Sequence, residues 1–508
     1  MNNKEKAAFN TVVVYIRLII TTLINLYLAR AVLLALGVED FGIYSLVGSV
    51  VSMLSFLSSS MSVSTQRFLS FHLGKNNYEI QNVIFSSSFF LHVILGLVIV
   101  IILIAMMPLI FNSSIQIPIN RVGIAQWVYV IMIGGTFCTI ISVPYEATLT
   151  AHENFLFISI LTVAINLIKL VFVILLPFIP YDKLVFYALI ILLTQFLTFI
   201  TEWLYSKRKY DESHFNRFNI KKETIKQITS FTVWNTFGGL AVIGRSQGLS
   251  VVINIFSGVI SNASYGLANQ VSGALRSLAM GVQSALNPQI MKNEGAGEHT
   301  GMAKLALYQS KYTYLILILL ALPLYIDMPF VLEIWLKEVP PDALIYCRLI
   351  LIIVLIQQVS SGLPVAIQAV GNIKPYQITI STIILFTVVF AYVFLKLGYP
   401  GYYALVASVI IEIICLVVRP FFAARYGGIS IKSFITVVLL PCFVVSLASA
   451  FASFFLFKFL SLSGSFLGLV ILIAITTTII FIASYITMSQ YERHVFGGFV
   501  KKLKKQKL

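Results

Sequence analysis

GVEDFGIYSL, residues 37–46, joins two apolar stretches near the start of the chain, and GVISNASYGL, residues 258–267, joins two others beyond its middle. An offset of 221 residues aligns them without a gap, so that Gly37 meets Gly258 and a Val, a Tyr and a Leu also match. Transporters are often built from two repeated bundles of helices. The two stretches therefore predict a chain made of two similar halves.

Apolar runs long enough to cross a bilayer fill most of the chain. The 508 residues are 59% hydrophobic and 11% charged, whereas a soluble domain is about 45–50% apolar and about 25% charged. A spanning helix needs about 20 apolar residues. Fourteen candidate spans lie near 10–36, 41–66, 83–112, 122–145, 155–178, 184–206, 226–256, 260–290, 305–327, 345–370, 375–397, 402–424, 433–458 and 464–488. The sequence predicts an all-α integral membrane protein with about 14 transmembrane helices.

The repeat divides these spans into two lobes of six and a final pair. Pro144 aligns with Pro364 at an offset of 220, and each closes the fourth span of its half. Two six-helix units with the same orientation are related by a pseudo-two-fold axis along the membrane normal. We therefore expect an N-terminal lobe at 1–206, a basic cytoplasmic linker at 207–225, a C-terminal lobe at 226–425, and two extra helices with a basic tail at 426–508.

Basic residues set the expected orientation. The formal net charge is +16, from 35 Lys and Arg against 19 Asp and Glu. The largest basic run (206–226) and the terminal KKLKKQKL both follow even-numbered spans, so the positive-inside rule places them and both termini in the cytoplasm. In a membrane protein this excess indicates cytoplasmic loops and anionic lipid headgroups rather than nucleic acid. The first run is longer than a signal-peptide core, and we expect an uncleaved span.

Motifs for catalysis, metals or nucleotides are not indicated. The six histidines form no paired motif, and the four cysteines lack metal-ligand spacing. NEGAGEH (293–299) lacks the Lys-Ser/Thr ending of a phosphate loop. The outer connections, of which the longest lies around 327–342, are too short for the acceptor chemistry of a membrane glycosyltransferase or polymerase. We expect a transporter rather than an enzyme, with no metal and no cofactor.

Charged side chains inside the spans are mostly cations. Each costs at least about 2.5–3.5 kcal/mol at the bilayer centre, so such residues usually have a function. Five lie well inside spans: Arg17, Arg30, Lys169, Arg245 and Arg276. Glu412 is the only comparably deep acid, and the first five spans carry none. A cationic interior with too few carboxylates predicts a water-filled cavity and an anionic ligand.

Polar residues accompany these cations at helical spacing. One face of the eighth span carries Asn269, Gly273, Arg276, Met280, Gln283 and Asn287, and one face of the first span carries Arg17, Thr21 and Asn25. Other interpretations stay open, because small polar faces also pack helices together and long cations near a helix end can snorkel, as Arg30 could. Lys169 could pair with Glu412. Lys311 and Arg348 lie near span ends, and we expect them to anchor those ends at the interface.

The sequence resembles the Wzx-like polysaccharide and O-antigen flippases, the polysaccharide transporter family of the superfamily that also contains the MATE exporters and the lipid II flippases. The resemblance is carried by the stretches LARAVLLALGVEDFGIYSLVGSVVSMLSF (28–56), STQRFLSFHLGKNN (64–77), PYEATLTAHENF (144–155), NPQIMKNEG (287–295) and AVGNIKPYQ (369–377). It runs through the first twelve spans, and the final pair agrees with fourteen-span branches. It implies two lobes around a cationic cleft, and alternating access.

The implied activity is export of an undecaprenyl-pyrophosphate-linked oligosaccharide, an intermediate of O-antigen and lipopolysaccharide assembly, across the bacterial inner membrane. Membrane lipids and other polysaccharide assembly proteins would be its partners. The pyrophosphate would be attracted by Arg17, Arg30, Lys169, Arg245 and Arg276, and sugars would be bound by Asn25, Asn269, Gln283 and Asn287. Glu412 is the carboxylate available for ion coupling. Two alternatives are a lipid II flippase and a MATE-type cation-coupled multidrug antiporter, although the latter typically has an acidic site in its N-terminal lobe.

Overall fold

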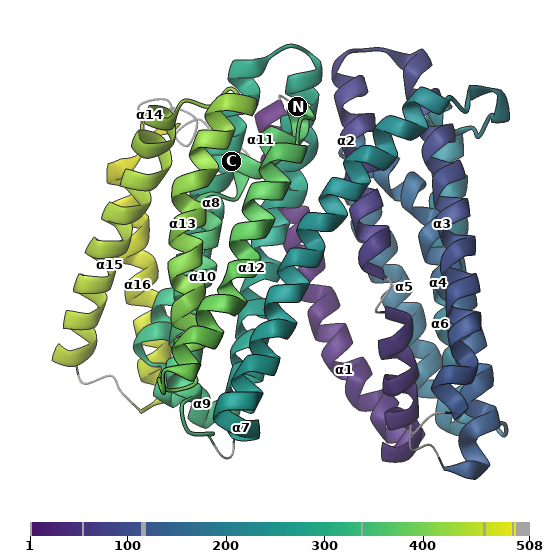
Figure 1. Cartoon of the computed structure of the whole chain (residues 1–508), viewed down its shortest axis with the longest axis horizontal. Helices are drawn as coiled ribbons and strands as arrows, with labels where there is room; N and C mark the ends of the chain where they lie inside the picture. The colour runs from purple at the N-terminus through teal and green to yellow at the C-terminus, as the bar shows by residue number, and fades with distance from the viewer. Residues whose placement is uncertain are drawn as a thin grey trace, which may run out of the picture. The chain divides into compact units, whose positions relative to one another are not determined.

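The computed structural model describes residues 3–52, 55–112, 118–336, 339–460, 464–489 and 492–493. Over these ranges the chain is helical and contains no strand (Figure 1). The helices up to the middle of the chain are α1 (Asn3–Ser52), α2 (Ser55–Gly74), α3 (Tyr78–Asn112), η1 (Ile119–Arg121), α4 (Val122–Ala151), α5 (Phe155–Leu175), η2 (Leu176–Phe178), α6 (Lys183–Lys209), η3 (Asp211–Ser213), η4 (Arg217–Asn219) and α7 (Lys222–Gly295).

The helices that follow are α8 (His299–Ile326), α9 (Met328–Trp335), α10 (Ala343–Val359), α11 (Gly362–Val370), α12 (Lys374–Lys396), α13 (Tyr403–Tyr426), α14 (Ile431–Phe434), the π-helix η5 (Ile435–Leu439), α15 (Leu440–Phe459) and α16 (Phe466–Thr487). Twelve stretches of the described chain are long and apolar enough to span a membrane. One of them is α7, whose 74 residues suffice for two crossings. Another ends at Gly37 inside α1, and the rest of α1 is followed by α2. The prediction of an all-α membrane protein with about 14 transmembrane helices is confirmed.

Gly37 and Gly258 interrupt the two longest helices, α1 and α7. Their backbone angles are nearly the same, with φ 79° and ψ 170° at Gly37 and φ 78° and ψ −177° at Gly258. This region of positive φ is accessible essentially only to glycine. A Cβ at either position would meet no heavy atom within 4 Å, so the backbone conformation, rather than packing, requires glycine. The two glycines aligned by the repeat thus make the same break, which supports a duplicated architecture.

The chain forms two compact units. Unit 1 consists of Met1–Gly239 and Asn287–Glu298, and unit 2 consists of Leu240–Leu286 and His299–Leu508. α7 therefore contributes to both units, because its middle part belongs to unit 2 and its two ends belong to unit 1. The domain boundaries expected at 206 and 226 stay a prediction.

In unit 1, α4 packs against α3 and α6, and α1 packs against α5. The fully buried Tyr129 donates a hydrogen bond to the Leu103 carbonyl oxygen over 2.8 Å, which joins α4 to α3. Arg121, just before α4, forms ion pairs with Asp40 of α1 and with Asp182, which caps α6. The hydrogen bond with Asp40, together with the contact to Asp182, raises the pKa of Arg121.

In unit 2, α12 packs against α13, and α10 packs against α8 and α13. The buried Tyr346 of α10 and Ser261 of α7 share a hydrogen bond of 2.8 Å. The last pair of helices, α15 and α16, pack against each other and against α8. Phe451 of α15 is 80% exposed, as expected of a face that meets lipid.

Lys311 is not the interfacial anchor that we expected. It is 1% exposed in α8, and its ammonium group contacts both oxygens of Glu492, at 2.8 and 3.1 Å. Tyr312 also donates to Glu492 over 3.1 Å. The expectation failed because position along the span does not reveal the partner: the chain after α16 returns to this helix and supplies a buried carboxylate.

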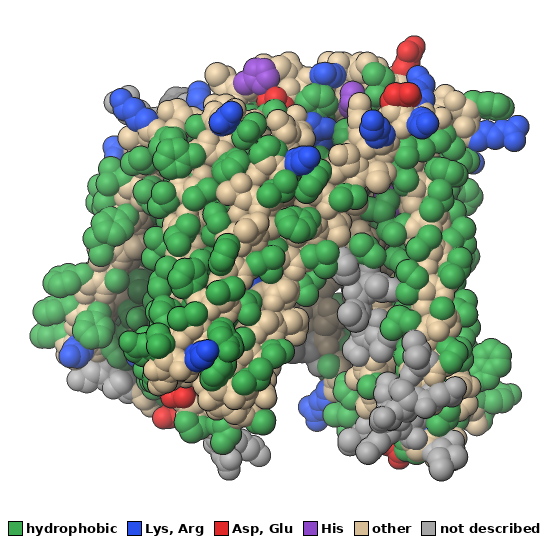
Figure 2. Space-filling model, in the orientation of Figure 1, with side chains coloured by type: hydrophobic (Ala, Val, Ile, Leu, Met, Phe, Trp, Pro, Cys, Tyr) green, Lys and Arg blue, Asp and Glu red, His purple; other side chains and the backbone are tan. Residues whose placement is uncertain are grey.

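Hydrophobic side chains cover the flanks of the helices in both units (Figure 2). Lys and Arg gather mainly at one end of each unit: the end where α2 is followed by α3 in unit 1, and the end near α14 in unit 2 (Figures 1 and 2). This distribution is typical of a membrane protein, whose apolar belt meets lipid and whose basic residues favour one side. The chain is a multi-pass membrane protein.

Candidate functional site

A buried ion pair links α7 to α13 in unit 2. Arg245 Nη1 lies 2.5 Å from Glu412 Oε1, and the side chains are only 9% and 1% exposed. Two glycines allow α12 to approach α7 beside Arg245, because a Cβ at Gly248 would lie 2.8 Å from Val388 and one at Gly244 would lie 3.3 Å from Leu385. The small residues next to Arg245 therefore serve the packing of α7 against α12.

A second arginine shares the same carboxylate. Arg419 Nη2 lies 3.5 Å from Glu412 Oε2, and Nη1 donates to Ser360 Oγ over 2.8 Å. Arg419 follows Glu412 by seven residues on α13, which places both on one face of the helix. Arg419 was not among the residues predicted from the sequence, although its spacing from Glu412 was a signal that could have found it.

Gln357 of α10 extends the network to a third arginine, and the adjacent Gln358 binds a glutamine of α7. Gln357 donates to Glu412 Oε1 over 2.5 Å and accepts a hydrogen bond of 2.8 Å from Arg276 Nη2. Arg276 Nε also donates to Ser272 Oγ over 3.0 Å, so the direct partners of Arg276 are neutral. Gln283, two turns further along α7, donates to Gln358 Oε1 over 3.0 Å. The sequence analysis did not select Gln357 and Gln358, although two adjacent glutamines inside an apolar span could have indicated that α10 contributes to the site.

We call Arg245, Arg276, Arg419, Glu412 and Gln357 the arginine cluster. It contains three guanidinium groups and one carboxylate, so its formal charge is positive by two. Positive charges buried in excess of carboxylates are stable only where water or an anion reaches them. Arg276 is half-buried, unlike Arg245 and Glu412. Arg419 is also half-buried, but it pairs with Glu412, whereas Arg276 donates to neutral oxygens among the described residues.

The other predicted residues lie elsewhere. Asn269 is half-buried on the unit 2 part of α7, and no side-chain hydrogen bond joins it to the arginine cluster among the described residues. Asn287 belongs to unit 1, and its Oδ1 is buried without a hydrogen-bond partner in the described part of the chain. Lys169 lies on α5 in unit 1, and none of the described ion pairs includes it. The carboxylate of Glu412 is occupied by Arg245 and Arg419, so its suggested pairing with Lys169 is wrong.

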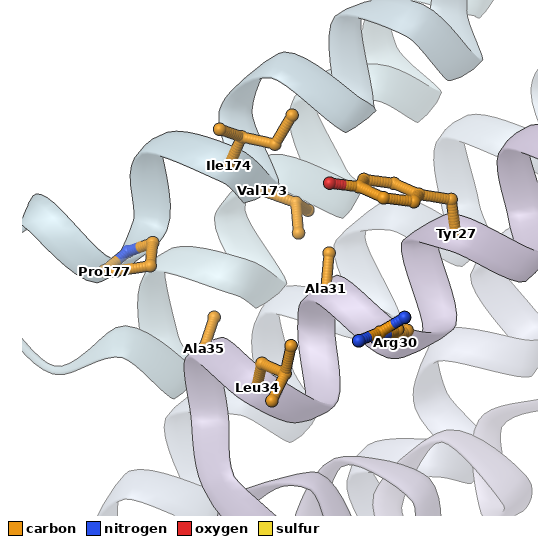
Figure 3. A pocket seen from close by; sticks show the side chains of 8 residues that line it. All are labelled: Tyr27, Arg30, Ala31, Leu34, Ala35, Val173, Ile174 and Pro177. Atoms are coloured by element: carbon orange, nitrogen blue, oxygen red, sulfur yellow. The ribbon is translucent and has the colours of Figure 1, made fainter.

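Arg30 lines a hollow of about 420 Å³ in unit 1 (Figure 3). The other lining residues are Tyr27, Ala31, Leu34 and Ala35 of α1, Val173 and Ile174 of α5, and Pro177 of η2. Tyr27 points its hydroxyl group toward Val173 and Ile174, across the apolar wall (Figure 3). Arg30 is exposed and makes neither an ion pair nor a side-chain hydrogen bond with any described residue. Asn25 is exposed on the same helix and does not line the hollow.

Glu412 is not the only buried acid among the described residues, although its position as the deepest acid within the spans stays a prediction. Glu202 of α6 is 5% exposed, and its Oε2 has no hydrogen-bond partner in the described chain. Helix α4 also continues past the predicted span end at residue 145 to Ala151, which brings Glu146 into the helix. Glu146 lies within electrostatic range of Arg17 and Glu202. The fourth span was predicted to end too early because a proline usually ends a helix, whereas α4 passes through Pro144 and includes the exposed Glu146.

The fold is that of known membrane transporters. One similar structure is described as an outward-facing conformation of a multidrug resistance MATE family transporter of the MOP superfamily, with a TM-score of 0.72, 17% identity, and coverage of 84% of this chain and 96% of that one. A MATE structure in the bent conformation gives a TM-score of 0.72 at 17% identity, covering 84% and 97%. A third similar structure is a MOP superfamily transporter from Pyrococcus furiosus, whose description says that the reverse polarity of its binding pocket suggests a different function. Its TM-score is 0.71 at 17% sequence identity, and the match covers 84% of this chain and 96% of that one. These likenesses concern the fold alone.

The family is defined by the sequence. The profile described as "Polysaccharide biosynthesis protein" matches residues 4–294, more than half of the 508 residues, and the chain belongs to this family. The resemblance to Wzx-like flippases is thereby confirmed. No curated protein sequence matches the chain. Both the family and the fold are those of membrane transporters.

Proposed function

We propose that the protein moves an undecaprenyl-pyrophosphate-linked oligosaccharide from the cytoplasmic to the outer leaflet of the bacterial inner membrane. Transport would proceed by alternating access, without chemical change of the substrate and with both termini in the cytoplasm. Membership of the polysaccharide biosynthesis family supports a lipid-linked glycan as the cargo. The arginine cluster is the observation that carries the proposal, because a buried site with more guanidinium groups than carboxylates favours an anion.

The pyrophosphate would bind at Arg276. This guanidinium is half-buried, and it donates only to the neutral oxygens of Ser272 and Gln357. A phosphate oxygen can replace such neutral acceptors with a charge-assisted hydrogen bond, which is shorter and stronger. With the cell interior negative, outward movement of each negative charge is also favoured by about 2.3 kcal/mol per 100 mV. The potential could thus drive export without a coupled ion.

The remaining cations, Arg17, Arg30 and Lys169, would bind other parts of the substrate in unit 1. Arg17 and Lys169 are half-buried on α1 and α5, where they would attract phosphate or acidic sugars. The Arg30 hollow, which has apolar walls, would accept part of the polyprenyl chain. Sugar hydroxyls would bind to polar side chains along α1 and α7, namely Asn25, Asn269, Gln283 and Asn287. Other polysaccharide assembly proteins would supply or consume the glycan.

The first test is replacement of Arg276 by Gln in cells that depend on this protein for surface polysaccharide. Arg276→Gln keeps a hydrogen-bonding side chain but removes the charge, and we expect surface polysaccharide to fall at least about tenfold, since a charge-assisted hydrogen bond contributes roughly 1.5–3 kcal/mol. The matched control is Arg348→Gln. Arg348 lies on α10 in the same unit, but it donates to the Tyr325 carbonyl oxygen and is not in the arginine cluster.

The outcome also separates the alternatives. Unchanged polysaccharide in Arg276→Gln, at equal protein level, would contradict the cationic binding site. Lysis on depletion, without loss of surface polysaccharide, would instead indicate a lipid II flippase. Drug resistance that depends on Glu412 would indicate a cation-coupled antiporter.

A further inference from the structure

The segment of residues 210–221, which joins α6 to α7, has a fixed structure on unit 1. It contains the short helices η3 and η4, and both pack against α3. The segment projects past α3 at the basic end of unit 1 (Figure 1). A signal for membrane orientation needs only basic residues and no particular structure. The fixed structure therefore indicates a second role for this segment.

One side chain of α3 holds the segment in place. Asn82 Nδ2 donates to the carbonyl oxygen of Glu212 over 3.0 Å and to that of His214 over 2.8 Å. Asn82 Oδ1 accepts a hydrogen bond of 2.6 Å from Asn219 Nδ2. Both polar ends of the Asn82 side chain thus bind the segment, one near its start and the other near its end.

Two buried serines of α3 add further attachments. The backbone N–H of Asn216 donates to Ser86 Oγ over 3.1 Å, and that of Lys221 donates to Ser87 Oγ over 3.4 Å. These bonds use backbone groups of the segment and leave the side chain of Lys221 exposed. The segment is therefore held through its backbone, while its longer side chains are available for contacts outside the protein.

The exposed side chains of this region are mostly basic. Residues 207–226 contain seven Lys and Arg and three Asp and Glu. All seven cations are exposed, whereas one of the acids, Glu212, is buried, with its Oε1 2.5 Å from His152 Nε2. Turning one acid inward makes the outer face more positive than the sequence count alone. Figure 2 shows Lys or Arg side chains beside hydrophobic ones at this outer edge of unit 1.

An aromatic ring lies among these cations. Phe218 is 78% exposed, and the guanidinium carbon of Arg217 lies 4.8 Å from the centre of its ring. We call Arg217, Phe218, Lys221 and Lys222 the linker surface. Exposing so large an apolar side chain to water is unfavourable, so an environment that takes up both the ring and the positive charges would stabilise it.

A membrane surface is such an environment. Lys183–Lys209 and Lys222–Gly295 are both long and apolar enough to span a membrane, and the segment joins their ends, which holds it at the level of the headgroups. Phe beside Lys and Arg is typical of segments that lie in the headgroup region, where the ring enters the boundary with the acyl chains. Basic residues there attract anionic lipids. An acidic protein would account for the cations, but not for their position at the ends of spanning helices.

We propose that the linker surface binds the anionic headgroups of the surrounding phospholipid bilayer. Phe218 inserts between the headgroups, and Arg217, Lys221 and Lys222 contact their phosphate groups. Asn82 is a positioning residue, because it fixes the segment that carries these side chains. The proposal concerns the phospholipids of the membrane and does not depend on which substrate the protein transports.

The test uses a fluorescent reporter at position 218. Phe218→Trp is introduced after Trp127, Trp203, Trp234 and Trp335 have been replaced by Phe. The protein is reconstituted in vesicles of phosphatidylcholine with a small fraction of phosphatidylglycerol, and bromine is carried either by the phosphatidylglycerol or by an equal amount of the phosphatidylcholine. Bromine quenches a nearby indole. We expect brominated phosphatidylglycerol to quench at least about twofold more, because basic residues concentrate anionic lipid around them, and we expect this preference to disappear at about 1 M salt.

Two kinds of variant separate charge from structure. Arg217→Gln with Lys221→Gln removes two charges of the linker surface and should abolish the preference. The matched control, Lys396→Gln with Lys458→Gln, removes two exposed cations of unit 2 and should leave the preference unchanged. Asn82→Ala keeps all these cations but releases the segment from α3, and it should reduce the preference.

Equal quenching by the two brominated lipids, or quenching by neither, would overturn the proposal. Loss of the preference in the unit 2 control would also overturn it, because net charge alone would then be the cause. If the protein with the replaced tryptophans does not fold, native mass spectrometry compares the phosphatidylglycerol retained by the native protein and by Arg217→Gln with Lys221→Gln, and equal retention would contradict the proposal. Neither measurement involves transport, so a failure of the proposed function would leave this result standing.

Discussion

Glu412 accepts a hydrogen bond from Gln357 and pairs with Arg245 through one oxygen, and it pairs with Arg419 through the other. A carboxylate held in this way between two guanidinium groups is a structural counter-charge. A role of Glu412 in ion coupling stays a prediction. Breaking a buried ion pair by removing one partner is costly, because the other charge is left uncompensated.

At this position, Glu412→Gln should destabilise the protein by about 3–5 kcal/mol. The reason is that Arg245 and Arg419 would then face each other without an acid. The measurement is the thermal unfolding midpoint of the purified protein in detergent, and adding Arg245→Met should recover part of the loss. A Glu412→Gln protein with an unchanged midpoint, but with transport that no longer responds to protons or Na⁺, would favour the coupling role instead.

Single residues were predictable from the sequence where their chemistry alone marked them. Arg245, Arg276, Gln283 and Glu412 stood out as polar groups in apolar spans. Arg245, Arg276 and Glu412 belong to the arginine cluster, and Gln283 binds Gln358 in the same unit. Their partners could not be assigned, because helical spacing gives the face of one helix and not the neighbour that it meets. The pairing of Glu412 with Arg419 rather than Lys169 depends on that tertiary arrangement.

On the scale of secondary structure, the breaks in α1 and α7 depend on one glycine each. Both helices would otherwise continue through a point where the backbone turns to positive φ. The two positions are predictable from the repeated stretches, because a matching glycine in two apolar segments is a visible signal. Their nearly identical backbone conformation gives a physical reason why both positions are glycine.

Gly37→Ala and Gly258→Ala should each cost about 1–3 kcal/mol, the usual strain of a side chain held in such a backbone region. Gly42→Ala and Gly266→Ala are matched controls in the same helices. They have open space around the new Cβ and no positive φ, so little change is expected. Thermal unfolding in detergent measures all four. If the control variants lowered the unfolding midpoint as much as Gly37→Ala and Gly258→Ala, the backbone conformation at the two breaks would not be the reason for glycine there.

The attachment of the chain after α16 to α8 gives a pH dependence. Burial alone would raise the pKa of Glu492, but hydrogen bonds from Lys311 and Ser489 outweigh it, and the net pKa is lowered. A carboxylate with a depressed pKa stabilises the folded state above its unfolded pKa of about 4.3 and loses that contribution as the pH falls through the folded value.

We therefore expect the unfolding midpoint of the native protein to fall as the pH is lowered from about 5 to about 3. In Lys311→Met with Glu492→Leu, which replaces the buried pair by apolar side chains, part of this dependence should disappear. The same pH profile in both proteins would mean that the pair does not contribute.

At the scale of the whole molecule, composition and periodicity predicted an all-α membrane protein of about 14 transmembrane helices with two related halves. The spans were predictable because they depend on the hydrophobicity of long segments, and the two halves were predictable from the aligned stretches 37–46 and 258–267. The part played by α7 was not predictable. Its 74 residues serve both units, and sequence patterns indicate where a helix is apolar but not which unit its ends contact.

The most direct measurement of the central claim is transport in liposomes. The purified protein is reconstituted with an undecaprenyl-pyrophosphate-linked oligosaccharide, and the fraction of glycan that reaches an enzyme or lectin on the far side is followed with time. We predict transfer by the native protein and by Arg348→Gln, and loss of most transfer in Arg276→Gln. Equal transfer in the native and Arg276→Gln proteins, or none beyond that of protein-free liposomes in any, would contradict the account.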